Sequence, residues 1–443
     1  MVFLRNMLPS AAFVQVGLLL LSACVQSAPA SSGLAVDTRQ AGDDGHWVAT
    51  WTSMPQLVEP DNMPPVPFRG GTTLKDATLR QTLHMSIGAP RIRVQISNTF
   101  GGSDLPITAA SLALPTGGKA GVGGIDTSTL TALTFDGGKA STTVPRGKVV
   151  YSDPVDFKVA PESMLTVSLY SQAGQQGSSI TGHPGSRTTS WMQQGNHVNA
   201  SSVAGTSTKH WYWVSVVEAW APLDSSAFVI LGDSITDGRG SIDDANNRWP
   251  DLLLARMQKS PATAKIGVNN QAAGGNRVLQ DGLGPSLVSR YKRDAIGQQG
   301  VKWVMVFEGV NDIGTAGADA GSQSRVGDQL IAALKRIAAD CRAAGLRVFA
   351  ATITPFGGSG QSYSSPVREQ TRQKVNQWIL TSGTFDAVVD FGKMLGSGGS
   401  ATSSQLASQY DGGDHLHPNV AGYQHLADQF PLEIFAGNST ASA

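Results

Sequence analysis

The chain has 443 residues, 40% of them apolar, so it can bury one or two sizeable hydrophobic cores. Its 33 Lys and Arg residues balance 33 Asp and Glu residues, and no long run of one charge occurs. This balance argues against a surface that holds a nucleic-acid backbone, so no nucleic-acid partner is expected. The charged fraction of 15% and the 51 glycines favour a β-rich, exported globular protein.

Residues 1–30 have the pattern of a signal peptide. A positively charged start precedes an apolar stretch at 11–22 that is too short to span a bilayer, and small residues at 28–30 offer a cleavage site. We therefore expect export from the cytoplasm. The string LSAC at 21–24 also resembles the lipobox of bacterial lipoproteins, in which Cys24 would carry a lipid. Free secretion and lipid anchoring both stay open, and such a lipid is the one membrane contact expected.

Two cysteines, Cys24 and Cys341, are the only ones in the chain. Because one of them lies in the leader, no disulfide framework is predicted, and packing must hold the fold together. Cys341 follows Leu330, Leu334 and Ile337 at helical spacing. We interpret it as a buried thiol on the core face of a helix rather than a catalytic cysteine.

After a linker at 31–44, residues 45–222 have the pattern of an all-β domain. Apolar and polar residues alternate at 91–96 and again at 165–170, as they do in strands with one buried face. Clusters rich in Gly and Ser separate such runs and indicate turns. The sequence therefore predicts a β-sandwich or jelly-roll-like domain.

The pattern changes near residue 226, where apolar runs begin to alternate with helical periodicity. The predicted strands are 227–231, 301–307, 346–352 and 387–390, and the predicted helices are 249–258, 324–344, 365–378 and 420–430. This alternation predicts a parallel sheet with helices on both faces, within a second domain at 226–437. Ligands of such sheets bind beyond the carboxyl ends of the strands.

Polar residues capable of catalysis occur where those strand ends should be. Ser234 follows the first strand, and Asp414 and His417 follow the last. A hydroxyl is a poor nucleophile unless a base takes its proton and a carboxylate orients that base. Ser234, His417 and Asp414 can supply these three roles. After the serine motif the chain contains three histidines that could be the base: His415, His417 and His425.

Such a reaction also needs hydrogen-bond donors for the negative charge that develops on the carbonyl oxygen. Backbone amides on a glycine turn or a side-chain amide can serve. Gly274 and Gly275 are candidates for the first kind of donor, and Asn311 for the second.

The strings GDSITDG, NQAAGGNRVL, EGVND and DHLHP resemble, in order, the four sequence blocks of the SGNH or GDSL hydrolases; they lie at 232–238, 270–279, 308–312 and 414–418. The resemblance covers about 226–435 and implies a three-layer α/β/α, flavodoxin-like fold. The N-terminal half, with HWVATW and TLRQTLHMSIG, resembles an extra domain that precedes one branch of the family.

The resemblance also implies a role for each matching residue. Ser234 would be the nucleophile and, through its own amide, the first oxyanion donor. Gly275 and Asn311 would be the second and third donors. His417 would be the base, and Asp414 would orient it. The family usually has Gly where Ala272 stands, so the choice of Gly275 over Gly274 rests on spacing alone.

These residues predict a carboxylic ester hydrolase that works through an acyl-enzyme without a metal or an organic cofactor. The expected partner is an ester substrate: an acylated, acetyl-type polysaccharide or a short-chain ester. The GxSxG motif of the α/β-hydrolases is absent. Arg277 lies beside the oxyanion glycines, and both a substrate contact and a surface salt bridge fit it. A monomer is expected.

Two other functions fit parts of the sequence. A metal-dependent phosphoesterase would use the cluster Asp411, Asp414, His415 and His417, but the further His and Asn-His ligands of such sites are missing. A non-catalytic carbohydrate-binding protein would have a broken catalytic block, and none is broken. The aromatic residues 211–213 are interpreted as core rather than as a sugar platform. Four histidines of the β-rich half are expected to have structural or surface roles: His84, His183, His197 and His210.

Overall fold

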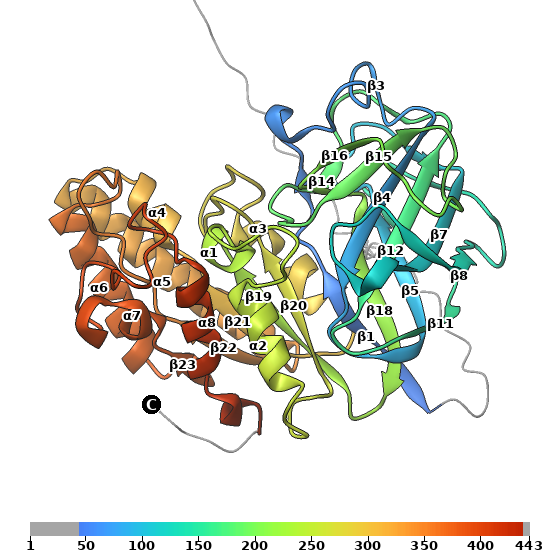
Figure 1. Ribbon diagram of the computed structural model, residues 1–443. Helices are drawn as coiled ribbons and strands as arrows, with labels where there is room; N and C mark the ends of the chain where they lie inside the picture. The colour runs from blue at the N-terminus through green and yellow to red at the C-terminus, as the bar shows by residue number, and fades with distance from the viewer. Residues whose placement is uncertain (1–43, 437–443) are drawn as a thin grey trace, which may run out of the picture. The chain divides into compact units, whose positions relative to one another are not determined.

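A computed structural model describes residues 44–436 (Figure 1). The leader at 1–30, the lipobox with Cys24 and nearly all of the linker at 31–44 lie outside the described residues. No helix between residues 44 and 436 is long and apolar enough to cross a membrane.

Antiparallel sheets make up the N-terminal half, as the alternating pattern predicts. One sheet has the order β1-β18-β5-β10, with β11 paired to β5; its strands are β1 Gly45–Thr52, β5 Ala89–Ser97, β10 Val149–Tyr151, β11 Val155–Val159 and β18 Val214–Pro222. A second has the order β16-β15-β4-β12-β7-β8; its strands are β4 Ala77–His84, β7 Ala109–Pro115, β8 Ile125–Ala132, β12 Met164–Ser171, β15 Ser190–Gln194 and β16 Thr206–Thr208.

Three small sheets complete this half. They pair β13 Gln175–Gln176 with β3 Thr72–Thr73, β6 Leu105–Ile107 with β9 Thr142–Val144, and β14 Thr181–His183 with both β17 Trp211–Tyr212 and β2 Gln56–Leu57. The last of these sheets matters for function, because β14 leads directly into a loop that contacts the candidate site.

One hydrophobic core is shared by the two larger sheets of this half. Val94 and Ile96 of β5 and Val167 and Leu169 of β12 all belong to it, and none of the four is exposed. A core built from two sheets is the arrangement of a β-sandwich. The aromatic residues 211–213 are buried in the same core, so their interpretation as core residues is confirmed.

A five-stranded parallel sheet forms the centre of the C-terminal half, in the order β20-β19-β21-β22-β23. Its strands are β19 Ser226–Gly232, β20 Ile266–Ala272, β21 Val301–Phe307, β22 Arg347–Ala351 and β23 Ala387–Val389. Counted along the chain, this is the 2-1-3-4-5 order of flavodoxin-like sheets. The fold predicted for this half is therefore confirmed.

Helices cover both faces of this sheet (Figure 1). The helices α2, α7 and α8 pack together, and α3, α4, α5 and α6 form a second group. Their bounds are α1 Ser234–Asp237, α2 Trp249–Met257, α3 Leu287–Tyr291, α4 Val310–Thr315, α5 Ala320–Ala343, α6 Pro366–Thr381, α7 Phe391–Leu395 and α8 Val420–Gln429. All four helices predicted from periodicity are present, with ends shifted by a few residues.

The strand β20 was not predicted, although it is a full member of the sheet. Its sequence is polar because it contacts the β-rich half through hydrogen bonds rather than apolar side chains. The Asn269 side chain donates to the Ala49 carbonyl at 2.9 Å, and the Ser86 hydroxyl donates to the Val268 carbonyl at 2.7 Å. Gly267 approaches so closely that a Cβ there would lie 2.7 Å from the Ala49 oxygen. Hydrophobic alternation could not reveal such a strand.

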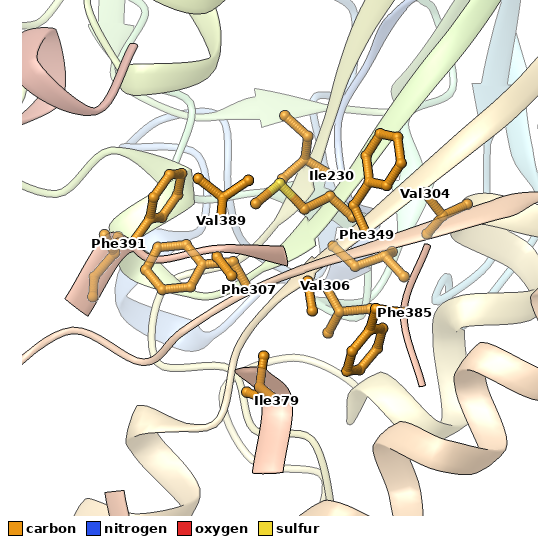
Figure 2. Close-up of a cluster of buried hydrophobic side chains, with 14 of the residues drawn as sticks. Ile230, Val304, Val306, Phe307, Phe349, Ile379, Phe385, Val389 and Phe391 are labelled. Carbon is orange, nitrogen blue, oxygen red and sulfur yellow. The ribbon is translucent and has the colours of Figure 1, made fainter. Parts of the chain in front are cut away.

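The core of the C-terminal half consists of side chains from the central strands and the helices that cover them. Figure 2 shows part of it, with Ile230, Val306 and Phe349 from three strands gathered among aromatic neighbours. Cys341 lies in this core, fully buried and with a free thiol, as predicted. Burial raises the pKa of this thiol to about 11, which keeps it protonated and unreactive at neutral pH.

The buried apolar residues divide into two clusters at 227/228. Ala227 packs in the cluster of the β-rich half, and Phe228 packs in that of the α/β half. The described residues nevertheless group as one compact unit. The predicted domains at 45–222 and 226–437 stay a prediction.

A buried arginine, Arg290 of α3, connects the carboxyl ends of three strands. It is 1% exposed. Its guanidinium donates to the carbonyls of Gly232 at 3.1 Å and Gln271 at 2.6 Å, and to the side chains of Asn276 at 3.0 Å, Asp294 at 3.2 Å and Glu308 at 3.1 Å. Because all of its donors are used inside the protein, this one side chain holds the ends of β19, β20 and β21 together.

We expect Arg290→Met to lower the free energy of unfolding by about 3–5 kcal/mol, because it removes five buried hydrogen bonds and leaves the Glu308 side chain without its donor. Asp294 and the Gly232 carbonyl each keep another donor, from Arg293 and from the Ala273 amide. Denaturant unfolding followed by circular dichroism measures this loss. Lys292→Ala, two residues away, removes an exposed pair with Asp340 and should change stability by less than about 0.5 kcal/mol. Equal effects of the two variants would contradict the assigned role.

Candidate active site

The register of the parallel sheet brings the candidate residues to one edge. Gly232 at the end of β19 pairs with Ala272 of β20 and with Phe307 of β21. The residues that follow these three positions therefore emerge side by side beyond the sheet. They include Ser234 and Gly275, which the sequence analysis had singled out.

Ser234 is the first residue of the short helix α1, directly after β19. Asp233 caps this helix, its side chain accepting from the Ile235 amide at 3.0 Å. Gly238 ends the helix in a left-handed conformation, with a φ of 93°. Because Asp233 is the cap, the Ser234 hydroxyl is not used for capping. The amide of a first helical residue also has no acceptor inside its helix.

Ser234, His417 and Asp414 form a chain of hydrogen bonds. The Ser234 hydroxyl lies 2.7 Å from Nε2 of His417, and Nδ1 of His417 lies 2.7 Å from a carboxylate oxygen of Asp414. A second carboxylate oxygen of Asp414 accepts from the His417 amide at 2.8 Å. The ring thus donates from Nδ1, which leaves Nε2 free to accept the hydroxyl proton.

Burial and neighbouring charges shift the pKa values of His417 and Asp414. Burial lowers the pKa of His417, the Asp414 carboxylate opposes this effect, and Arg239 and Arg187 lower the pKa further. Burial by itself would raise the pKa of Asp414, but hydrogen bonds from the amide and ring of His417 outweigh it and lower that pKa. At neutral pH the pair is therefore a neutral imidazole beside a carboxylate, which is the state that a general base requires.

The two candidate glycines differ in what their amides do. The Gly274 amide donates to a carboxylate oxygen of Asp237 at 2.9 Å. The Gly275 amide has no acceptor among residues 44–436, and Gly275 has a φ of 71°, where side chains are strained. This geometry leaves Gly275 as the glycine whose amide can receive a ligand oxygen.

Asn311 lies at the start of α4, after β21, and is 4% exposed. Its side-chain nitrogen donates to the Asn276 carbonyl at 2.8 Å, and its oxygen accepts from the Tyr363 hydroxyl at 3.2 Å. These two bonds fix which way the amide faces. The nitrogen retains a second proton that can be donated to a ligand.

Asp312, the neighbour of Asn311, holds the glycine loop in place. Its carboxylate accepts from the amides of Val278 at 2.8 Å and Leu279 at 3.0 Å. Burial raises the pKa of Asp312 to about 6, although these amides act in the opposite direction. Arg277 of the same loop donates to the Asp281 carbonyl at 2.6 Å and forms no salt bridge with a described residue.

The remaining acidic and histidine residues of the last block form a separate pair. The carboxylate of Asp411 accepts from the His415 amide at 3.1 Å and lies 2.5 Å from Nδ1 of the same residue. Asp411 therefore pairs with His415 and not with His417. Between residues 44 and 436, no three His, Cys, Asp or Glu side chains converge to hold a metal ion.

Three residues around the site were missed by the sequence analysis. Tyr363 and Gln361 come from the loop after β22; Gln361 donates to the Asp414 carbonyl at 2.5 Å. Their place after a strand end was the signal that could have found them. His183 was expected to be structural, yet its Nε2 lies 2.8 Å from Asp237 of the nucleophile helix. Nothing in the sequence connects these two positions.

One comparison with known proteins identifies a family for part of the chain. Residues 230–425 match the GDSL-like lipase/acylhydrolase family. A search of curated proteins gives no match.

Among solved structures, one similar chain is an acetylxylan esterase from Geobacillus stearothermophilus. It has 22% identity and a TM-score of 0.35, with 48% of this chain and 96% of that chain covered. Another is a GDSL-like lipase from Bacteroides thetaiotaomicron, with 17% identity and a TM-score of 0.35, covering 48% of this chain and 89% of that chain.

The buried carboxyl group of Asp233 generates a prediction about stability. Burial raises its pKa from 3.8 to about 7. In this pH range the folded state therefore binds a proton that the unfolded state has lost, so the group's contribution to stability falls as pH rises from 3.8 to about 7. Asp233→Asn keeps the hydrogen bond to the Ile235 amide but has no group that titrates in this range. We therefore expect the melting temperature of this variant to fall less steeply between pH 3.8 and about 7 than that of the wild type.

Asp224→Asn is the matched control. Asp224 is exposed beside Lys265, and a side-chain hydrogen bond from Lys265 lowers its pKa below the usual value of 3.8. The effect of Asp224→Asn on the melting temperature should therefore be confined to more acidic pH. If the melting temperature of Asp233→Asn falls with pH as steeply as that of the wild type, the expectation is contradicted.

Proposed function

We propose that this protein is an exported serine ester hydrolase, because residues 230–425 match the GDSL-like lipase/acylhydrolase family. Ser234 is the proposed nucleophile, His417 the base and Asp414 the residue that orients the base. The Ser234 amide, the Gly275 amide and the Asn311 side chain are the proposed oxyanion donors.

One observation carries the proposal: the unbroken hydrogen-bond chain from the Ser234 hydroxyl through His417 to Asp414, with 2.7 Å at each side-chain step. Ser234 comes from α1 and the other two residues from the loop before α8, so that Ser234 and His417 are 183 residues apart in the chain. A serine with a merely structural role would not need a buried histidine whose other nitrogen is held by a carboxylate.

Acylation follows from this geometry. His417 takes the hydroxyl proton at Nε2 as the Ser234 oxygen attacks the ester carbonyl carbon. The carbonyl oxygen becomes negatively charged and accepts hydrogen bonds from the proposed oxyanion donors. Because these donors are already in position, they lower the activation barrier. His417 then passes the proton to the departing alcohol oxygen as the C–O bond breaks, leaving an acyl-serine.

Deacylation repeats these steps with water. His417 takes a proton from the water, whose oxygen attacks the acyl carbon, and the same donors hold the second oxyanion. The proton returns to Ser234 as the acid leaves. Every proton transfer uses one imidazole, so the proposed cycle needs no metal and no organic cofactor.

The proposed substrates are acetyl-type esters of carbohydrates or short-chain esters, and the proposed location is outside the cytoplasm. The leader-like residues 1–30 support the location. A β-rich half beside the hydrolase half supports a polymeric substrate such as an acylated polysaccharide. Arg277, on the loop that carries Gly275, is a candidate for contacting the alcohol part.

Ser234→Ala tests the nucleophile. We expect kcat for p-nitrophenyl acetate and acetylated xylan to fall on the order of a million-fold, with the melting temperature nearly unchanged. The control is Ser241→Ala, which removes a serine hydroxyl that donates to the Gly238 carbonyl at 2.6 Å in the same segment. It should keep most of the activity. Wild-type turnover by Ser234→Ala would overturn the proposal.

The pH dependence of kcat/KM tests the base. His417 acts as a base only when neutral, and its pKa is lowered from 6.5, so activity should rise with pH to a plateau with a midpoint below 6.5. Arg239→Gln removes one of the charges that lower this pKa and should move the midpoint upward. Since Arg239 is largely exposed, the difference should shrink in high salt.

The control for this measurement is Arg325→Gln, because Arg325 is exposed and donates to Ser322 at 3.1 Å on α5. It should leave the midpoint unchanged. A midpoint above 6.5 in the wild type, or a downward shift in Arg239→Gln, would contradict the role assigned to His417.

A further inference from the structure

A buried side chain of the β-rich half reaches the helix that carries the nucleophile. His183, the last residue of β14, lies 2.8 Å through Nε2 from a carboxylate oxygen of Asp237, the last residue of α1. The two side chains are 4% and 1% exposed. A contact so well shielded from water and at this distance is a strong electrostatic interaction.

The hydrogen-bond partners of His183 define which ring nitrogen contacts which group. Nδ1 lies 3.1 Å from the Met54 carbonyl, which can only accept, so Nδ1 must carry a proton. Nε2 therefore shares a further proton with the Asp237 carboxyl group. The ring also stacks on Trp211, with centroids 5.9 Å apart. Held from three sides, the ring has one orientation, and so has the carboxyl group it contacts.

Asp237 connects two loops that carry proposed oxyanion donors. Its backbone amide donates to the Asp233 carbonyl at 2.9 Å within the nucleophile turn. Its second carboxylate oxygen accepts from the Gly274 amide at 2.9 Å, one residue before Gly275. The position of this carboxylate therefore sets the separation between the Ser234 amide and the Gly275 amide.

We infer that His183 is a positioning residue for the oxyanion site: through Asp237 it holds the nucleophile turn and the Gly274–Gly275 loop at the spacing that the developing oxyanion requires. The inference rests on the proposed function. It makes the β-rich half part of the catalytic apparatus, although none of its residues need touch the reacting atoms.

The same loop of the β-rich half closes over the carboxylate from a second direction. Gly185 packs against Asp237 so tightly that a Cβ there would lie 1.7 Å from the oxygen that accepts from Gly274. Two residues in the segment 183–185 thus converge on one carboxyl group. Such close packing leaves the Asp237 side chain no alternative position.

Two substitutions at one position separate the two bonds of the ring. In His183→Gln the side-chain nitrogen can reach the place of Nε2 and still donate to Asp237. In His183→Asn it can reach the place of Nδ1, so the bond to Met54 survives and the bond to Asp237 is lost. We expect kcat of His183→Asn to fall roughly ten- to a hundred-fold, with KM within about twofold, because misplaced donors act on the transition state.

His183→Gln should recover most of this loss. Ser86→Ala is the matched control, since it removes another buried hydrogen bond between the halves, from the Ser86 hydroxyl to the Val268 carbonyl. It should lower the melting temperature but keep wild-type kcat. If His183→Asn, His183→Gln and Ser86→Ala all turn over at the wild-type rate well below their melting temperatures, the inference is wrong. Equal losses in the two His183 variants would also overturn it.

Gly185→Ala keeps the test decisive should His183→Asn fail to fold. It leaves His183 intact and displaces the same carboxylate, so kcat should again fall while KM is kept; an unchanged kcat would overturn the inference. Ser234→Ala, measured alongside, tests the proposed function separately from the role of His183. If the wild type cleaves no ester, or if Ser234→Ala keeps wild-type turnover, the proposed function is wrong. If the wild type is active and the His183 and Gly185 variants are equally active, only the role of His183 is wrong.

Discussion

The structure of the C-terminal half depends on a buried guanidinium at the carboxyl edge of its sheet. Arg290 donates to the ends of β19 and β20 and to Glu308 after β21. The last carbonyls of these strands lie buried at that edge, where an unpaired carbonyl is costly; the Gly232 carbonyl accepts from the Ala273 amide at 3.2 Å as well as from Arg290. One side chain with five donors meets this requirement, so the three loops can diverge beyond the edge and still keep fixed positions.

The carboxyl groups buried around this guanidinium carry an electrostatic cost, which Arg290 reduces for Glu308 and Asp233. Burial raises the pKa of Glu308 to about 8, that of Asp233 to about 7 and that of Asp312 to about 6. Two of these carboxyl groups hold the loops in place: Asp233 caps the nucleophile helix, and Asp312 holds the glycine loop. These buried groups lower the stability of the fold at neutral pH but hold the loops of the site rigidly, a combination that is common at functional sites.

Sequence reasoning was strongest where hydrophobic periodicity or motif order carried the information. It predicted both fold classes and all four long helices, and it named Ser234, His417 and Asp414, which the structure brings within hydrogen-bonding distance. It missed β20 because that strand is polar on the side that contacts the β-rich half. It missed Tyr363 although that residue follows a strand end, and it missed His183 because the importance of His183 arises from a contact between distant segments, which no local pattern records.

The β-rich half contacts the C-terminal half through directional hydrogen bonds, and these fix how the two halves pack. An apolar interface would have tolerated small shifts, whereas directional hydrogen bonds such as those of Asn269 and Ser86 fix the register of β20 against β1 and the loop after β4. His183 acts on the oxyanion loop itself, through Asp237, whose carboxylate accepts from the Gly274 amide. The hydrogen bonds along β20 stabilise the contact between the halves, whereas a displacement of His183 would misalign the proposed oxyanion donors.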